Sequence, residues 1–190
     1  MKLSGNSLIE VIIALAIFLV GTVAVTNLVF SNLNVVDRDT DETRRMFFAR
    51  EAIELARDTR DSNWLSGNAF SAGLSIGNDR SGVPNWNPGT DAAWDFTAST
   101  LNDSSAQIIQ VNGGSSDGAY ANLVGSLTGS STAYRRLVIL HPICDDGSIK
   151  NDNDTCAATQ VGIRVESIVT STRKSVTRTT TLFADFYDWK

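Results

Sequence analysis

One acidic side chain, Glu10, lies in the most apolar stretch of the chain. Between Leu8 and Phe30 it is the only ionisable residue. A charged carboxylate inside a membrane-spanning segment costs roughly 3 kcal/mol, so its presence indicates a function or a charged partner. The simpler alternative is a glutamate near the membrane edge that reaches into the lipid headgroups. The residues that flank Glu10 must decide between these two interpretations.

A second group of residues with possible chemistry lies late in the chain, where Cys144 and Cys156 enclose an acidic loop. In an oxidising compartment two such cysteines most simply form a disulfide. A bridge across a loop of this length contributes about 3 kcal/mol on a chain-entropy estimate. Asp145, Asp152 and Asp154 offer oxygen ligands for calcium. Their spacing lacks the EF-hand pattern, so we expect a solvated surface loop, with calcium as the alternative.

The sequence contains no recognisable catalytic constellation. His141 is the only histidine and is followed by Pro142, which favours a strand-end residue over a catalytic base. Serine and aspartate are numerous but form no nucleophile-elbow, Walker or metalloprotease pattern. One histidine and two cysteines are also a poor zinc ligand set. We therefore expect no enzyme activity, no cofactor and no resident metal.

Three tryptophans lie in or beside the region rich in Gly, Ser and Asn: Trp64, Trp86 and Trp94. We expect them to fill gaps beneath a long connecting loop. The alternative is an adhesive surface on which they stack against sugars.

Length and charge limit the possible classes of protein. With 190 residues and 42% hydrophobic residues, the chain suits one domain with a sizeable core once the apolar run is set apart. The net charge is −5. Nucleic-acid-binding proteins carry a basic patch or stripe, and no such patch is visible here. We therefore expect no direct nucleic-acid partner.

The apolar run is long enough to cross a membrane. From Leu8 to Phe30 a helix reaches roughly 35 Å, which exceeds the hydrocarbon core of a bilayer. A secretory signal peptide has a shorter apolar region of about 7–15 residues and an Ala-x-Ala-like site, which is absent here. Lys2 before the run and the acidic residues 37–42 after it favour a cytoplasmic N-terminus and an exported body.

The helix is predicted to continue well past the apolar run, from about Ser7 to Asp61. Residues 35–59 contain no Pro or Gly and are largely good helix formers. Gly21 is the only helix breaker within the whole segment. The first half is apolar on all sides and the second has one apolar face, and Asn63 at the end is able to take a left-handed conformation. This predicted face has helical spacing and consists of Phe48, Ala49, Ala52, Ile53, Leu55, Ala56 and Thr59.

Strand patterns appear in the last third of the chain. Residues 134–140 form a β-rich run that we expect to stop before Pro142, residues 160–166 alternate strictly, and residues 175–183 have high β propensity. The link 171–174 is short enough for an antiparallel hairpin, and Gln107–Val111 is a possible further strand. We predict an α+β fold in which an antiparallel sheet of three or four strands packs on the helix face.

The N-terminal motif carries a resemblance to a known family. Gly5, followed by Ser7-Leu8-Ile9-Glu10-Val11 and an unbroken apolar helix, resembles the class III signal sequence of type IV prepilins and of the related type II secretion pseudopilins. The resemblance implies cleavage after Gly5 by a prepilin peptidase, which leaves Asn6 as the first mature residue. Glu10 then becomes the fifth-position glutamate of the family. Where this chain has Asn6, the family usually has an N-methylated Phe.

The same resemblance implies an organisation of the chain. It assigns a leader (1–5), a transmembrane and filament-core half of the helix (6–30), an amphipathic half (31–61), a variable connecting region (62–133) and a sheet with the disulfide loop (134–190). It also implies that the helix can melt locally near Gly21 on assembly.

A function, partners and a location follow from the resemblance. The chain is expected to be a structural subunit of a pilus-like filament, such as those of twitching motility or adhesion. Glu10 would pair with the N-terminal amine of a neighbour. The expected partners are other pilin subunits and the membrane assembly platform. The prepilin would be single-pass in the cytoplasmic membrane, and the assembled subunit would lie in an extracellular filament or a periplasmic pseudopilus.

Two alternatives stay open. Within the family, one alternative is a minor pilin or pseudopilin that primes or tips a filament. From a different class, a membrane-anchored extracellular binding module or adhesin that never polymerises would share the helix and the exported domain.

Overall fold

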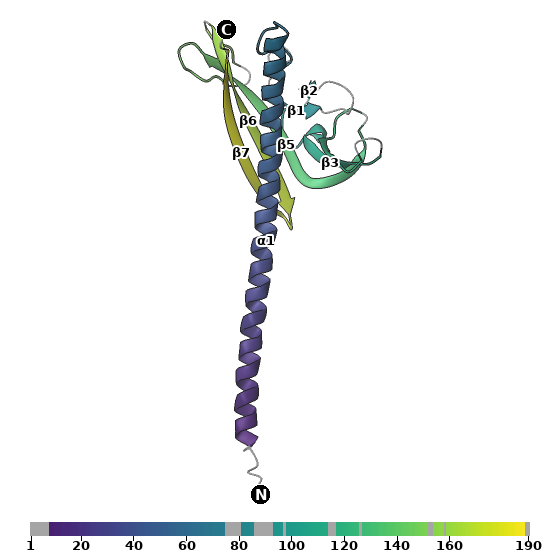
Figure 1. Cartoon of the computed structure of the whole chain (residues 1–190), viewed down its shortest axis with the longest axis vertical. Helices are drawn as coiled ribbons and strands as arrows, with labels where there is room; N and C mark the ends of the chain where they lie inside the picture. Colours follow the sequence, from purple (N-terminus) through teal and green to yellow (C-terminus); the bar gives the residue numbers. More distant parts are fainter. Residues whose placement is uncertain are drawn as a thin grey trace. The chain divides into compact units, whose positions relative to one another are not determined.

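The chain forms one long helix followed by a seven-stranded sheet in a computed structural model (Figure 1). The structure describes residues 8–74, 81–85, 93–96, 98–113, 117–125, 127–151, 154–157 and 159–188. It divides into two units, residues 1–42 and residues 43–190. The first unit is described from Leu8 and is entirely helical. The second unit contains the rest of the helix and the whole sheet, so the predicted α+β fold is confirmed.

Helix α1 runs from Leu8 to Leu65, beyond the predicted end at Asp61. It ends in a Schellman motif, in which the Asn68 N–H donates to the Asn63 carbonyl (2.9 Å) and the Gly67 N–H donates to the Trp64 carbonyl (3.1 Å). Gly67 takes the left-handed conformation, with φ 70°. Gly67 takes this conformation in place of Asn63, the candidate named from the sequence, because glycine adopts it without a Cβ penalty.

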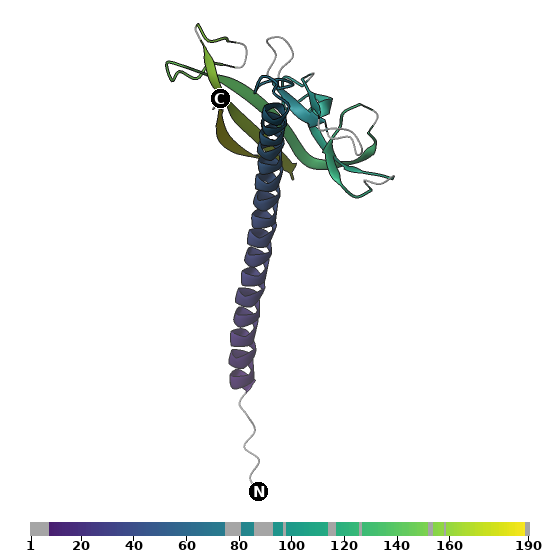
Figure 2. The same cartoon turned by 45° about the horizontal axis from the view of Figure 1, so that its top comes forward.

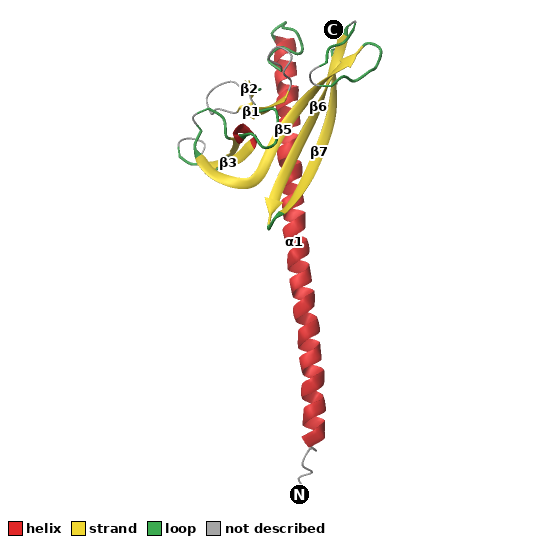
Figure 3. Ribbon diagram, turned by 180° about the vertical axis from the view of Figure 1, so that it is seen from behind, coloured by secondary structure: helices red, strands yellow, loops and turns green. Residues whose placement is uncertain are grey.

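The sheet is built on three long antiparallel strands, β5 (Gly129–Cys144), β6 (Gln160–Arg173) and β7 (Val176–Tyr187). These strands run alongside the second part of α1 (Figures 1 and 3). The other edge of β5 pairs with β1 (Ser81–Asn85) and β3 (Gln107–Val111), which lie on the side away from β7 (Figure 2). Two short strands complete the sheet: β2 (Ala93–Asp95) pairs with β1, and β4 (Tyr120–Asn122) pairs with β3.

The predicted sheet of three or four strands was too small. Residues 62–133, expected as a connecting region, contribute β1–β4, a short 3₁₀ helix (η1, Ser104–Ala106) and the start of β5. They also form a core cluster of their own against Leu137 of β5, whose other members are Val83, Ala98, Ala106 and Val124. Strands β2 and β4 have three residues each, which is too short to show a period of two in the sequence and explains why they were omitted.

The prediction that the strand stops before Pro142 is wrong. Strand β5 continues to Cys144, and Pro142 pairs with Ile163 of β6. Strand β1 pairs with β5 only at Val138 and Ile139, so on that side Pro142 lies at a sheet edge. Proline is tolerated at an edge, because a missing N–H there breaks no ladder hydrogen bond.

The predicted hairpin between the last two strands is confirmed. Strands β6 and β7 pair in continuous register from Gly162–Tyr187 to Arg173–Val176. Lys174 and Ser175 form the two-residue turn, and both have positive φ (49° and 63°). Positive φ at both positions is typical of a type I′ turn, whose twist matches that of the flanking strands.

Small residues allow α1 to approach the sheet closely. Ala49, Ala52 and Ala56 are fully buried and belong to two core clusters that include Val165 and Val169 of β6. The predicted apolar face is therefore largely correct, although its centre lies on the alanines while Leu55 and Thr59 are only half-buried. Interiors are close-packed, so larger side chains at these alanines would force the helix away.

Buried arginines fix the helix to the sheet at defined points. Arg136 of β5 donates to the Phe48 carbonyl (3.1 Å) and to Glu51 Oε2 (2.6 Å) of α1. Its other nitrogens donate to Asn122 Oδ1 of β4 (2.6 and 3.0 Å). Burial lowers the pKa of Arg136, and the Glu51 carboxylate opposes this shift. One guanidinium therefore joins α1, β4 and β5.

A second buried arginine, Arg45, lies on α1 and donates hydrogen bonds to the sheet. Arg45 donates through Nε to Thr180 Oγ1 of β7 (2.9 Å) and through Nη1 to Ser171 Oγ of β6 (3.0 Å). Such bonds are specific in direction, whereas the alanine contacts are not. The arginines therefore set the rotation and register of the helix on the sheet.

Replacing Arg136 with Met should lower the free energy of unfolding of the second unit by about 3 kcal/mol, because Asn122 Oδ1 would stay buried without its donor. Urea unfolding of the full chain in detergent, followed by tryptophan fluorescence, measures this change. Arg164→Met is the control, because Arg164 pairs with Asp185 on the surface and surface pairs contribute little. Equal shifts for the two variants would contradict the role given to Arg136.

Candidate functional site

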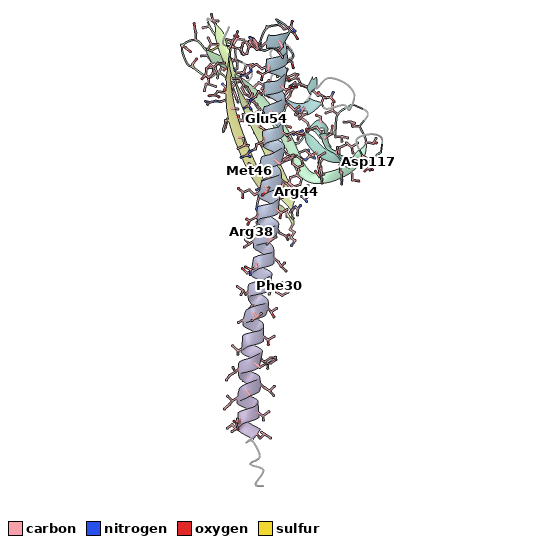
Figure 4. All side chains as sticks on the ribbon, in the orientation of Figure 1. Phe30, Arg38, Arg44, Met46, Glu54 and Asp117 are labelled. Carbon is pink, nitrogen blue, oxygen red and sulfur yellow. A yellow bond between two sulfur atoms is a disulfide. The ribbon has the colours of Figure 1, made fainter. Side chains whose placement is uncertain are left out.

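The first unit exposes its apolar side chains all around the helix. Every described residue from Leu8 to Thr40 is exposed, and side chains project from α1 on all sides near Phe30 (Figure 4). The exposed fraction of its large apolar side chains ranges from 49% at Val11 to 77% at Leu8. Apolar surface of this extent marks contact with a membrane or with another protein. By length and composition, α1 can span a membrane.

The exposed segment is longer than the predicted apolar half, which was expected to end at Phe30. Residues 31–40 are also exposed, and the second unit begins only at Thr43. The packed, amphipathic part of α1 therefore begins only after Thr40, with the buried Asp41. The sequence change at Asp37, where charged residues begin, is a better sign of this transition than the end of the apolar run.

Glu10 is the one charged group in the apolar part of α1. No ionisable residue occurs from Val11 to Val36. Within the described part of the first unit, the nearest basic residue is Arg38, roughly 42 Å along the helix. This segment therefore cannot neutralise Glu10 with a side chain of its own. The predicted cleavage site, Gly5 and Asn6, lies outside the described residues and stays a prediction.

A shallow hollow marks the position of Gly21. It has a volume of about 400 Å³ and is lined by Phe18, Gly21, Thr22, Val25 and Thr26, which share one helix face. Thr22 and Thr26 each donate their hydroxyl to the carbonyl four residues earlier, at 2.9 and 2.8 Å. These bonds leave the face effectively apolar, as lipid or a packed helix requires. The helix is continuous here, and the predicted melting on assembly stays a prediction.

The predicted disulfide between Cys144 and Cys156 is confirmed, with an S–S distance of 2.01 Å. The enclosed loop folds back on the end of β5, since the Lys150 N–H donates to the Pro142 carbonyl (2.9 Å). Asp146 accepts the Ser148 N–H (2.8 Å). Hydrogen bonds from Ser148 lower the pKa of Asp146, so the loop is partly ordered by its own polar groups.

The calcium alternative for this loop stays a prediction. Of the three candidate ligands, Asp152 lies outside the described residues. Asp154 accepts a hydrogen bond from Asn151 Nδ2 (3.0 Å), and Asp145 is exposed. Among the residues that the structure describes, no three acidic, histidine or cysteine side chains gather as metal ligands do.

His141 lies within β5 rather than at its end, so that prediction is wrong. Its Nε2 is 2.9 Å from Glu166 Oε2, and its Nδ1 is 3.2 Å from the Lys150 carbonyl. Both neighbours are hydrogen-bond acceptors, and His141 thereby ties the disulfide loop to β6. This contact positions the loop.

The three tryptophans have different environments. Trp94 packs as predicted: its Nε1–H donates to Thr59 Oγ1 (3.2 Å), and its ring stacks on Phe96. Trp64 is mostly exposed at the end of α1, which contradicts a gap-filling role. Trp86 lies outside the described residues.

An aromatic hollow on the second unit was not predicted from the sequence. This hollow is lined by Thr43, Arg44, Phe47, Phe48, Tyr120 and Tyr134. The available signal was the Phe47-Phe48 pair, because adjacent residues of a helix point in different directions. Phe48 is buried and Phe47 is exposed.

Comparison of the chain with protein-family models, with curated proteins and with solved structures finds no match. The resemblance to prepilins therefore rests on the motif that surrounds Glu10.

Removing the disulfide should destabilise the second unit. The Cys144→Ala, Cys156→Ala double variant should lose about 3 kcal/mol of unfolding free energy, because the unfolded chain regains the entropy of the open loop. Urea unfolding in detergent measures the loss. The wild-type chain under a thiol reductant is the matched control and should behave like the variant. A wild-type unfolding midpoint that does not respond to the reductant would contradict this prediction.

Proposed function

We propose that this chain is a structural subunit of a type IV pilus-like filament, made as a prepilin and assembled through the first part of α1. The observation that carries the proposal is a long, exposed apolar helix with a single carboxylate, Glu10, close behind the Gly5-Asn6 motif. A filament subunit needs such a helix twice, first in the membrane and then among the helices of other subunits.

The exposed helix is suited to residence in a lipid bilayer, followed by transfer into a bundle formed by the helices of other subunits. Lipid tails are about as apolar as leucine, so helices associate in membranes through close packing and polar contacts. The hollow at Gly21, lined by Phe18 and Val25, allows a neighbouring helix to approach closely. A shift from lipid to helix contacts therefore requires no large change in apolar burial.

Glu10 makes assembly energetically favourable. A charged glutamate in a lipid environment costs roughly 3 kcal/mol, and α1 offers no basic side chain before Arg38. Cleavage after Gly5 would create a positively charged amine on Asn6. The amine of a neighbouring subunit can neutralise Glu10 and fix the stagger between the two helices. This pairing favours the growing filament over the unassembled subunit.

The second unit fits an exported coat for such a filament. A disulfide closes its Cys144–Cys156 loop, and disulfides persist in oxidising compartments outside the cytoplasm. The positive-inside rule also favours export of the body, since Lys2 precedes the apolar run and acidic residues follow it. The proposed partners are a prepilin peptidase, other pilin subunits and an assembly platform in the membrane.

Replacing Glu10 with Gln tests this function. The variant should accumulate in the membrane like the wild type, but its amount in sheared filaments should fall more than about tenfold, because the N-terminal amine loses its charged partner. Quantitative blotting of membranes and filaments, with immunogold electron microscopy against the second unit, measures both.

The control is Glu54→Gln, which removes an exposed carboxylate that pairs with Arg57 on the second unit. This variant should enter filaments normally. Normal incorporation of Glu10→Gln would contradict the role of Glu10. Labelling only at filament tips would favour a minor subunit, and the absence of filament labelling for the wild type would favour a membrane-anchored binding module.

A further inference from the structure

We propose that the second unit carries a head-to-tail contact site for a second copy of this chain. In this contact, Trp64 and Leu65 at the end of α1 enter the aromatic hollow beside Phe47 of the next copy. The inference deepens the proposed function and rests on it for the identity of the next copy as a filament neighbour. The contact has three components: a hollow, an apolar projection and opposite charges at the two ends of the unit.

The hollow has a volume of about 280 Å³, the liquid volume of about nine water molecules. Phe47 is 64% exposed and Tyr120 is 40% exposed at its rim. The Phe48 ring makes edge contacts with Tyr120 and Tyr134, at centroid distances of 5.5 and 5.3 Å. These contacts hold the walls in place, so the hollow is preformed and has room for one aromatic side chain.

The projection lies on the last turn of α1. Trp64 is 55% exposed and Leu65 is 80% exposed, and the helix ends just after them at the Gly67 motif. Trp64 lies roughly 26 Å along the helix axis from Phe47. The projection and the hollow therefore occupy opposite ends of one rigid helical segment. Aromatic residues set in pockets are the usual energetic centres of interfaces.

The hollow end of the unit is basic. The Arg173 guanidinium lies over the Tyr134 ring, 6.0 Å from its centroid, and Lys174 follows it in the exposed turn between β6 and β7. Arg44 is exposed in the wall of the hollow itself. Exposed basic side chains, Arg44 in the wall of the hollow and Lys174 in the turn beside Arg173, thus lie at this end of the unit.

The opposite end of the unit is acidic. The end of β7 lies beside the last turns of α1, where Arg60 lies over the Phe186 ring at 4.9 Å. Three arginines here have acidic partners: Arg57 pairs with Glu54, Arg60 with Asp61 and Arg164 with Asp185. Further exposed carboxylates at this end are those of Asp58, Asp145 and Asp188.

These components select one mode of association. A parallel two-fold dimer would bring hollow against hollow and basic end against basic end, and like charges oppose such a contact. An antiparallel two-fold dimer would satisfy both contacts but needs chains of opposite orientation, which the proposed filament does not contain. Head-to-tail contact instead joins the acidic, projecting end of one unit to the basic, hollowed end of the next. Because the two surfaces differ, the contact repeats among copies of one orientation without closing and builds an open chain. The second unit thereby favours polymerisation in one direction.

Cysteine cross-linking of the full-length chain in detergent tests the contact. One tagged version carries Phe47→Cys and a differently tagged version carries Leu65→Cys. The native cysteines are bonded to each other, so only the introduced thiols react. The mixed 47–65 product should exceed both the 47–47 and the 65–65 products by about tenfold.

Phe183→Cys is the matched control for Phe47→Cys, because Phe183 is also an exposed aromatic residue (58%) but lies on β7. A 183–65 product as abundant as the 47–65 product would overturn the proposal, as would a dominant 47–47 product. Absence of any mixed product at equal labelling would also overturn it and would leave the hollow to a different ligand.

Charge reversal gives a second readout that does not depend on the new thiols at the interface. With the cysteines in place, Arg44→Glu in one version and Asp58→Arg in the other should each reduce the mixed product several-fold. The two reversals combined should restore it, because the pair is again complementary. Failure of the combined variant to recover, with both chains folded by circular dichroism, would overturn the contact.

This test separates the contact from the proposed function. Filaments labelled by immunogold without a 47–65 product would overturn the contact and leave the filament role intact. A strong 47–65 product from a chain that is neither cleaved after Gly5 nor found in filaments would support the contact and contradict the pilin proposal.

Discussion

The structure depends on one constraint: the apolar side chains of the first unit have no protein around them. From Leu8 to Thr40 all described residues are exposed, although an apolar surface in water carries a free-energy cost of about 25 cal/mol per Å². Lipid or neighbouring helices must therefore cover this segment. The proposed cleavage, membrane storage and assembly are successive ways to meet that constraint.

The second unit has a different task. It must hold firmly a helix that is apolar on only one face. Its alanines let α1 lie close to β6, and Arg45 and Arg136 fix the position of the helix through directional hydrogen bonds. Alanine contacts alone would tolerate sliding of the helix along the sheet. A rigidly attached helix is also what a head-to-tail contact requires, since Phe47 and Trp64 must keep their separation.

The sequence predicted those parts of the fold that have strong periodicity. The long helix, the hairpin of β6 and β7, the strand Gln107–Val111 and the disulfide are confirmed. Strands β1, β2 and β4 were missed, because three to five residues carry little pattern and their pairing depends on distant partners. Burial of Arg136 was missed for a similar reason. Nothing in the adjacent pair Arg135-Arg136 indicates which side chain meets Phe48 and Asn122.

The candidate site was predicted through local motif and composition, whereas the contact surface was not. Glu10 stands out because its neighbours in sequence are all apolar. The hollow at Phe47 combines residues from α1, β4 and β5, so it exists only after folding. The net charge of −5 also does not reveal that the second unit has one acidic and one basic end. That separation of charge depends on where the fold places the acidic and basic residues.

The central claim, that this chain is a prepilin, is tested most directly by its mature N-terminus. The full chain should be expressed with a prepilin peptidase and without one, and its intact mass and N-terminal sequence should be determined from membranes. The account predicts loss of residues 1–5 and a new terminus at Asn6 only when the peptidase is present, with Gly5→Leu left uncut. A chain that keeps Met1 beside an active peptidase, or that is cut after the apolar run, would contradict it.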